Sequence, residues 1–201
     1  MGTREALVDA ATGLLDEGGA DAVTLREVGA RVGVSHNAPY KHFAGKEALL
    51  AAVAARELAR RSASLSALRD RPPGEALRAA MHDYVAWAQL HPNRFKLVFG
   101  TWTADAEGLG EAAHNAQTAL VDLVTAAQQA GALPPGDPVR LASLIRSLAH
   151  GAADLAAAGH LAAGGKGHAD PEDLIDDLFG YLRQASDTVT DPGTAKGGET
   201  R

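Results

Sequence analysis

The sequence of 201 residues contains no cysteine, which excludes a disulfide framework, a thiolate nucleophile and a cysteine-ligated zinc site. Aromatic residues make up only 4% of it and β-branched residues are sparse, whereas alanine and leucine are abundant, so helix is favoured over sheet. No apolar run approaches the roughly 18 residues of a membrane-spanning helix. The first residues also lack the apolar core of a signal peptide. We therefore expect an all-α cytoplasmic protein with no membrane partner.

The formal net charge is −6, which argues against a general nucleic-acid coat protein. The charge is unevenly distributed along the chain. Residues 1–61 hold eight basic and eight acidic side chains, whereas the remaining residues hold 11 basic and 17 acidic ones. This asymmetry indicates two parts with different functions, and the neutral first part leaves room for a local DNA-binding face.

Apolar side chains recur at helical spacing along almost the whole chain. Breaks in this pattern are Gly18-Gly19, Arg71-Pro72-Pro73-Gly74 and Gly131. Asp137-Pro138 and Asp170-Pro171 each combine a capping acid with a proline in the first helical turn, which predicts helices over about 138–158 and 171–188. The pattern predicts about nine helices in all, followed by a disordered tail over 190–201.

One segment of the first quarter carries a more specific pattern. Thr24 and Glu27 form a capping box, in which a hydroxyl and a carboxylate satisfy free amides at a helix start. Gly33 suits the left-handed turn that ends this helix, and Ser35 caps a third short helix through about His42. A capped helix, a tight turn and a second short helix predict a helix-turn-helix, although a purely structural helical hairpin would show the same elements.

The predicted second helix carries side chains that hydrogen-bond base edges and a methyl group that suits thymine. Hydroxyl, imidazole and ammonium groups that follow are placed to reach phosphates. The candidate base-contacting residues are His36, Asn37, Ala38 and Lys41, and the candidate phosphate-contacting residues are Tyr40, His42 and Lys46. Thr24 and Ser35 complete the predicted DNA-binding set. The plainer alternative is that these side chains are merely solvated, whereas Phe43 is expected in the core.

At these residues the sequence resembles the DNA-binding domain of the TetR family of bacterial repressors. The resemblance is carried by Thr24, Val28, Val32-Gly33-Val34-Ser35, Tyr40, His42-Phe43, Lys46-Glu47 and Leu49. Two features depart from the family pattern: Asn37 and Pro39 stand where members often have Gly and Leu, and Arg4 alone replaces a basic arm. The resemblance implies an N-terminal three-helix domain over 1–47, followed by a helical-bundle ligand-binding and dimerisation domain over 48–189.

The later part of the chain shows a second resemblance. His91–Phe99 and the pair His150-Gly151 are similar to a subgroup whose regulatory domain is named for a Trp-His-Gly signature, although Arg146 stands at the Trp position. The family resemblance further implies that the last two long helices pair with those of a second copy. Small residues that would permit close approach there are Ala152, Ala153, Ala156, Ala157 and Gly159.

Aromatic side chains on successive predicted helices offer the apolar walls of a cavity, and a few polar side chains offer anchors. The candidate ligand-binding residues are Trp87, His91, Phe95, Phe99, Trp102, His114, Gln117 and His150. They suit a moderately hydrophobic, metabolite-sized ligand, although protein cores use aromatic residues in the same way.

Catalytic and metal-binding patterns are absent from the sequence. It has no HxxxH or HExxH pair, no GxSxG and no phosphate-binding GxxxxGK[ST], so we expect no enzyme, no metal site and no cofactor. The sequence therefore predicts a homodimeric, TetR-like regulator that binds double-stranded operator DNA as a repressor and is released by a small hydrophobic effector. The alternative is a helical small-molecule-binding or interaction module without DNA binding.

Overall fold

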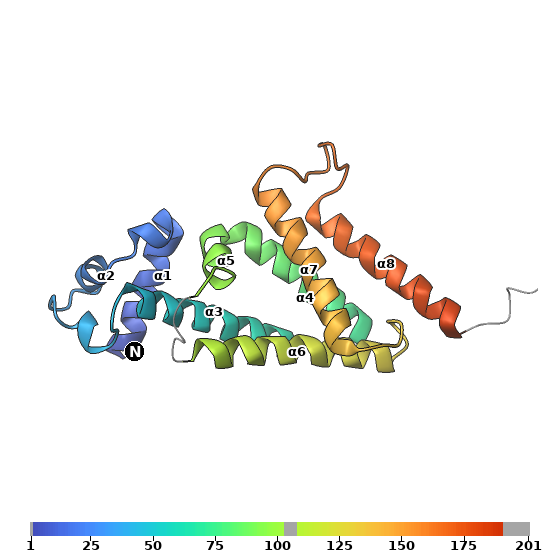
Figure 1. Cartoon of the computed structure of the whole chain (residues 1–201), viewed down its shortest axis with the longest axis horizontal. Coiled ribbons are helices and arrows are strands. Elements are labelled where there is room, and N and C mark those ends of the chain that lie inside the picture. Colours follow the sequence, from blue (N-terminus) through green and yellow to red (C-terminus); the bar gives the residue numbers. More distant parts are fainter. Residues whose placement is uncertain (1, 103–107, 191–201) are drawn as a thin grey trace, which may run out of the picture. The chain divides into compact units, whose positions relative to one another are not determined.

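The computed structural model describes residues 2–102 and 108–190, and every regular element in these ranges is helical (Figure 1). The elements are α1 (Thr3–Ala22), α2 (Leu25–Val32), the 3-10 helix η1 (Pro39–Lys41), α3 (Lys46–Ala67), α4 (Pro73–Leu90), α5 (Pro92–Val98), α6 (Leu109–Gln129), α7 (Pro138–Ala157) and α8 (Pro171–Thr190). The all-α prediction is confirmed, with eight α-helices and one 3-10 helix in the described part of the chain. Of the predicted tail, residues 191–201 lie outside the described residues.

The chain divides into two compact units. The first comprises Met1–Ser64 with Trp87–Thr118, and the second comprises Leu65–Ala86 with Ala119–Arg201. The first unit contains the predicted helix-turn-helix, and the second contains α7 and α8. The functional boundary expected after residue 47 stays a prediction.

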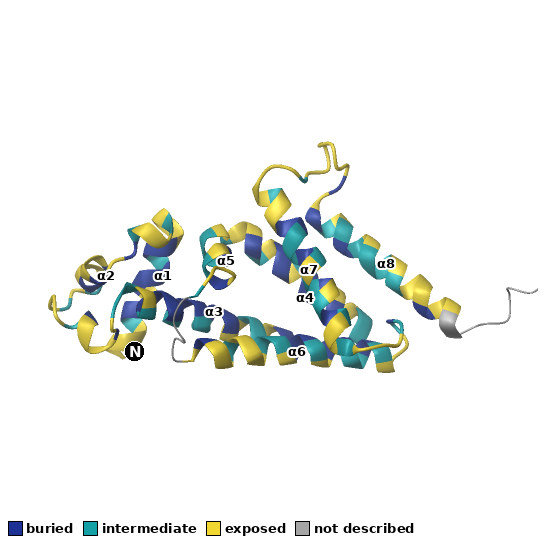
Figure 2. Ribbon diagram, viewed as in Figure 1, coloured by how far each residue is buried: buried dark blue, intermediate teal, exposed yellow. Residues whose placement is uncertain are grey.

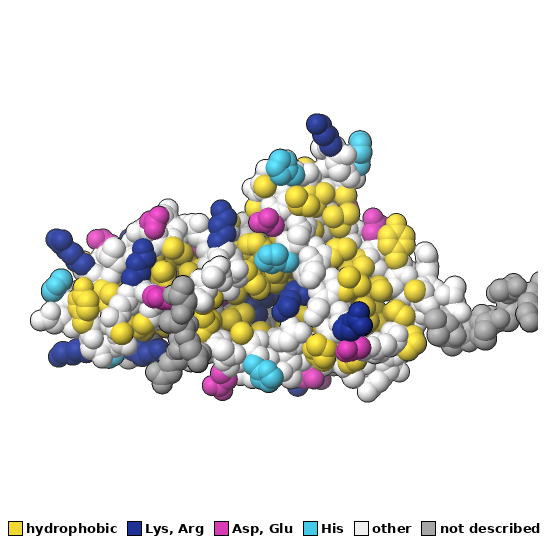
Figure 3. Space-filling view, viewed as in Figure 1, with side chains coloured by type: hydrophobic (Ala, Val, Ile, Leu, Met, Phe, Trp, Pro, Cys, Tyr) yellow, Lys and Arg dark blue, Asp and Glu magenta, His cyan; other side chains and the backbone are white. Residues whose placement is uncertain are grey.

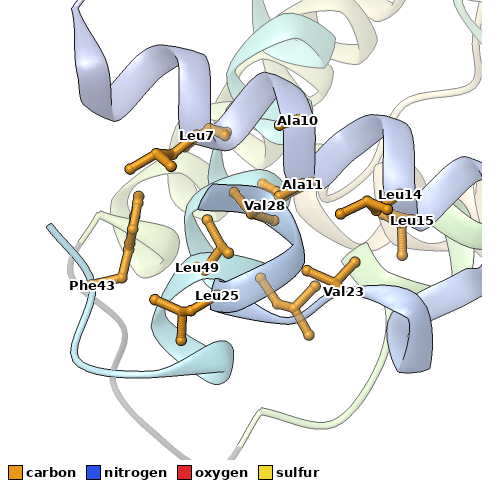
Figure 4. Close-up of a cluster of buried hydrophobic side chains, with 13 residues drawn as sticks. Leu7, Ala10, Ala11, Leu14, Leu15, Val23, Leu25, Val28, Phe43 and Leu49 are labelled. Atoms are coloured by element: carbon orange, nitrogen blue, oxygen red, sulfur yellow. The ribbon is translucent and has the colours of Figure 1, made fainter. Parts of the chain in front are cut away.

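The core of the first unit is built by the apolar face of α1. Leu7, Ala11, Leu14 and Leu15 lie at helical spacing and are at most 5% exposed. Figure 4 shows this cluster between α1, α2 and the first turns of α3, with Phe43 closing it. Figure 2 shows the same division between buried and exposed faces along each helix. This packing fixes the position of α2 and of the segment that follows it.

The predicted helix ends are explained by local backbone geometry. Gly18 and Gly19 are non-helical, and Gly19 has a φ of 72°, so the regular part of α1 stops there. Thr24 accepts a hydrogen bond of 3.1 Å from the Glu27 amide, and Gly33 ends α2 in the left-handed conformation, with a φ of 75°. Asp137 accepts a bond of 2.9 Å from the Val139 amide at the start of α7. Each of these caps and turns depends on residues only a few positions apart in the sequence, which is why the helix ends were predictable.

In the second unit, ion pairs join α4 to α8. Arg78 donates two hydrogen bonds of 2.6 Å to the carboxylate of Asp176, and His82 Nε2 lies 2.6 Å from the same carboxylate. The hydrogen bond from the Arg78 guanidinium is the main cause that lowers the pKa of Asp176. This cluster fixes the position of α8 along α4.

Of the small residues expected to permit close approach to a second copy, Ala157 and Gly159 are exposed, Ala156 is half-buried, and Ala152 and Ala153 are buried. Ala152 and Ala153 are 3% and 2% exposed in the single chain, so these two residues offer no surface to a second copy, and the pairing itself stays a prediction. The large apolar residues that α7 and the described part of α8 expose are Val139, Leu144, Leu155 and Tyr181. A helical repeat predicts that one face is buried, but it does not say whether the neighbour is the same chain or a partner.

Candidate nucleic-acid interface

The recognition segment after Gly33 is less regular than predicted. In place of one helix from Ser35 to His42, a turn over 36–38 leads into η1. The Ala38 amide donates to the Ser35 carbonyl at 2.9 Å, and the His42 amide donates to the Pro39 carbonyl at 3.0 Å. Both bonds span three residues, as in a 3-10 helix. Pro39 has no amide hydrogen and cannot make the bond that would continue an α-helix through this point.

Pro39 itself docks the segment on α2. It is buried, and a Cβ atom placed on Gly29 would lie 3.0 Å from Pro39 Cγ. The Val34 amide donates to the Gly29 carbonyl at 3.0 Å, so the turn and the proline meet the same glycine. The sequence showed Pro39 only as a departure from the family pattern, and its packing role against Gly29 was missed. A glycine inside a capped helix was the signal that could have found it, because a backbone without a side chain permits close approach.

The remaining side chains of the segment face outward. Pro39 and Phe43 form its buried floor, and Ala38 is half-buried. The exposed candidates are Thr24, Ser35, His36, Asn37, Tyr40, Lys41 and His42. The Tyr40 side chain is 53% exposed, and its ring centroid lies 5.8 Å from that of His36. Figure 3 shows Lys, Arg and His side chains projecting around the end of the first unit that carries α2 and η1.

Lys46 begins α3, whose first-turn amides have no carbonyl partners within the helix. Its side chain is 41% exposed, and Nζ lies 3.8 Å from the fully exposed carboxylate of Asp21. An ion pair of this length in solvent contributes little and exchanges readily for another anion. Arg4 lies over the Phe43 ring, 5.2 Å from its centroid, so the lone basic residue of the N-terminus is held close to the segment.

The positive charge of Arg31 is already paired with a carboxylate of the protein. It donates two hydrogen bonds of 2.8 Å to the Glu17 carboxylate, which lower the pKa of Glu17 and raise the pKa of Arg31. Arg31 therefore ties α2 to α1. Lys41 and Lys46 are the better placed cations for a nucleic acid.

The candidate ligand-binding aromatic residues of the first unit contact one another. Phe95 is 5% exposed, and its ring lies 6.1 Å from that of Trp87 and 5.4 Å from that of Phe99. Trp102 packs against the core of the same unit, and its buried Nε1 has no hydrogen-bond acceptor within the described ranges of the chain. These rings form an apolar wall, which both a pocket and a core require.

The polar candidates are spread more widely. His91 occupies the N-cap position of α5 without a capping side-chain hydrogen bond, His114 is exposed on α6, and Gln117 is half-buried on the same helix. His150 belongs to the second unit, where its Nδ1 lies 2.9 Å from the Tyr84 hydroxyl. Burial is the main cause that lowers the pKa of His150. The assignment of these residues to one ligand site stays a prediction.

An exposed segment rich in hydrogen-bonding groups, docked through a left-handed glycine turn on a capped helix, is typical of the helix-turn-helix class of DNA-binding regulators. Comparison with known families agrees. Residues 7–53 match the family described as bacterial regulatory proteins of the tetR family, and residues 77–181 match the tetracyclin repressor-like C-terminal domain. The chain belongs to the TetR family.

Solved structures give the same fold over nearly the whole chain. A protein with unknown function from Rhodococcus sp. RHA1 is 31% identical, with a TM-score of 0.78 and 92% and 95% of the two chains covered. FadR from Bacillus subtilis, in complex with stearoyl-CoA, is 15% identical, with a TM-score of 0.69 and coverages of 90% and 98%. AibR, in complex with isovaleryl coenzyme A and operator DNA, is 20% identical, with a TM-score of 0.63 and coverages of 89% and 97%.

No curated protein matches the sequence significantly. Within residues 2–102 and 108–190, no helix has the length and apolarity needed to cross a membrane. The same residues contain no group of three or more His, Asp or Glu side chains that could hold a metal ion.

Proposed function

We propose that this protein is a repressor that binds operator DNA as a homodimer through residues 1–47 and is released by a small hydrophobic effector bound within residues 48–189. The observation that carries the proposal is the exposed segment of Ser35 to His42, held on α2 by a buried proline. AibR, which shares the fold, was solved with operator DNA.

Sequence readout falls to His36, Asn37 and Lys41. An amide reads adenine and an ammonium reads guanine in the major groove, and each good pair contributes about 1–3 kcal/mol of discrimination. Ala38 is half-buried beside them and offers its methyl group to thymine. Contacts to the DNA phosphates position the protein without reading the sequence, and we assign them to Thr24, Ser35, Tyr40, His42 and Lys46.

Dimerisation falls to the exposed apolar face of α7 and α8. Leu144, Leu155 and Tyr181 are 56%, 47% and 67% exposed, which is unusual for large apolar residues along two adjacent helices. Two DNA-binding domains that enter successive major grooves must be about 34–36 Å apart, so a dimer of fixed geometry is required. A pairing of α7 and α8 with a second copy would bury this face and set that distance.

The fold relatives suggest an acyl chain as the hydrophobic part of the effector. FadR and AibR were solved with acyl thioesters of coenzyme A, one long-chain and one short-chain. The aromatic wall of Trp87, Phe95 and Phe99 suits the acyl part of such a molecule. A preference of about 2.7 kcal/mol for the conformation that does not bind DNA would shift the equilibrium a hundredfold.

The decisive experiment is fluorescence anisotropy with DNA from upstream of the protein's own gene and with shuffled DNA of equal length. Asn37→Ala and Lys41→Ala are expected to lose specific affinity while the affinity for shuffled DNA is retained. An equal loss of affinity for both DNAs would show that these side chains contact the DNA phosphate backbone and not the bases. A wild-type protein that prefers neither DNA, tested over several upstream fragments, would favour the alternative of a helical small-molecule-binding module.

A further inference from the structure

A surface cavity of about 560 Å³ lies within the first unit, between the end of α1, the start of α3 and α5 with the residues that follow it. Its wall is mainly apolar and includes Leu50, Leu97 and Trp102. Of the residues assigned above to the effector, this cavity contains only Trp102. It is therefore a separate candidate site beside the DNA-binding elements.

The rim of the cavity is basic. Lys46 and Lys96 both line it, against one carboxylate from Glu47. Among residues 2–102 and 108–190, the charge partner of Lys46 is Asp21, at a long distance of 3.8 Å, and the first-turn amides of α3 start at the same edge. Asn93 also lines the cavity, but its amide already donates to the Asp16 carbonyl at 3.3 Å. The rim thus offers cationic donors to an anion.

Trp102 contributes its indole ring to the wall. Trp102 Nε1 is buried and has no hydrogen-bond acceptor among the described residues. Because this nitrogen is buried, the ring meets a ligand in the cavity through its apolar atoms. An apolar chain that ends in an anionic group is the chemistry that this wall and this rim recognise together.

We propose that this cavity binds a small amphipathic carboxylate of medium-chain fatty-acid size, with its chain on Leu50, Leu97 and Trp102 and its carboxylate between Lys46 and Lys96. The consequence for DNA rests on the proposed function above. Lys46 cannot hold the ligand carboxylate and a DNA phosphate at once, so the bound carboxylate competes with operator DNA directly at the DNA-binding surface.

Binding is tested first without DNA, using decanoate below its micelle concentration. The two tryptophans of the chain are Trp87 and Trp102, so a Trp87→Phe background reports on Trp102 alone. Decanoate is expected to change the Trp102 emission saturably, whereas 1-decanol, which lacks the charge, should bind much more weakly. Lys96→Gln in this background should weaken decanoate binding about fivefold, the effect of losing one exposed charge contact.

The matched control is Lys166→Gln, which removes an exposed lysine of the second unit and should leave decanoate binding unchanged. Circular dichroism must show that both variants remain folded. A Trp102 emission that does not saturate, or equal effects of Lys96→Gln and Lys166→Gln, would overturn the proposal.

Competition is tested second, with operator DNA. Decanoate is expected to weaken DNA binding in the wild type and to do so about fivefold less potently in Lys96→Gln. Decanoate binding without any DNA binding would support the cavity as a carboxylate site and refute the proposed repressor function. DNA binding without decanoate binding would refute only the cavity, and binding of both without competition would overturn the shared use of Lys46.

Discussion

Arg94 donates two hydrogen bonds to the Asp16 carboxylate, from Nε at 2.8 Å and from Nη2 at 2.6 Å, and so fastens α5 to α1. Its Nη1 lies 3.5 Å from Glu57 on α3, a carboxylate that is only 3% exposed. The hydrogen bond to Asp16 is the main cause that raises the pKa of Arg94. Three helices of the first unit therefore meet at one guanidinium.

Arg94→Gln is expected to lower the free energy of unfolding by about 2 kcal/mol, because it breaks the two bonds to Asp16 and leaves the buried Glu57 with Arg60, at 2.8 Å, as its remaining charge partner. Asp16→Asn should cost about 1 kcal/mol, since Asp16 is partly solvated. Urea unfolding measures both. The control is Arg69→Gln, which breaks an exposed pair of 2.6 Å with Asp122 and should cost less than 1 kcal/mol. Equal costs for the two arginines would contradict the bridging role.

Gly29→Ala is expected to weaken DNA binding more than it lowers stability. The added methyl group would meet the rigid Pro39 ring at 3.0 Å, so the recognition segment must shift. Helix propensity favours alanine by about 1 kcal/mol and offsets part of the strain. The double variant Gly29→Ala with Pro39→Ala should regain part of the affinity in anisotropy measurements, because the clash is removed although the contact of the proline ring with α2 is also lost. A double variant that binds as weakly as the single one would refute docking through this contact.

Lys46→Gln is expected to weaken binding to specific and shuffled DNA alike. Removing one phosphate contact should flatten the slope of log K against log salt by about one unit per half-site. Anisotropy at four or more salt concentrations gives the slope. Lys166→Gln removes the same charge from an exposed position of the second unit and should leave the slope unchanged. An unaltered slope in Lys46→Gln would show that this lysine does not contact phosphate.

Leu144→Asp is expected to convert the dimer into a monomer, since an unpaired charge buried in the interface costs several kcal/mol. The side chain is 56% exposed in the single chain, so the monomer should remain folded. Sedimentation velocity gives the mass, and operator affinity should fall with it. Leu90→Asp, at a 74% exposed position outside α7 and α8, is the control and should remain a dimer. An intact Leu144→Asp dimer would place the interface elsewhere.

His150 is expected to make stability fall in mild acid. Burial holds the pKa of the folded-state imidazole below its ordinary value of about 6.5, so the unfolded chain takes up the proton first as the pH falls. The stabilisation is fully present above about pH 6.5 and is lost as the pH falls from there toward the folded pKa. Urea midpoints between pH 5 and 8 should show this loss in the wild type and less of it in His150→Gln. The exposed His114→Gln is the control and should follow the wild type.

The sequence by itself determined the features that depend on near neighbours. The all-α class follows from residue composition and helical spacing, and the ends of α2 and α7 follow from Thr24, Gly33 and Asp137 acting within one turn. The spacing of residues 24–49 also identified the family and the exposed candidates. In each case the residues concerned lie within a few positions of one another, and local geometry fixes what they do.

Only the tertiary structure decided the contacts between distant residues. It placed Pro39 against Gly29, turned the expected recognition helix into a turn and a 3-10 helix, and joined Asp16 to Arg94. It also buried Ala152 and Ala153 and left Leu144 and Leu155 exposed. A helical period gives the face that a residue occupies, but the neighbour of that face depends on how the other helices pack. Ion pairs and close backbone approaches between helices carry no fixed spacing, so they become visible only once the helices are placed.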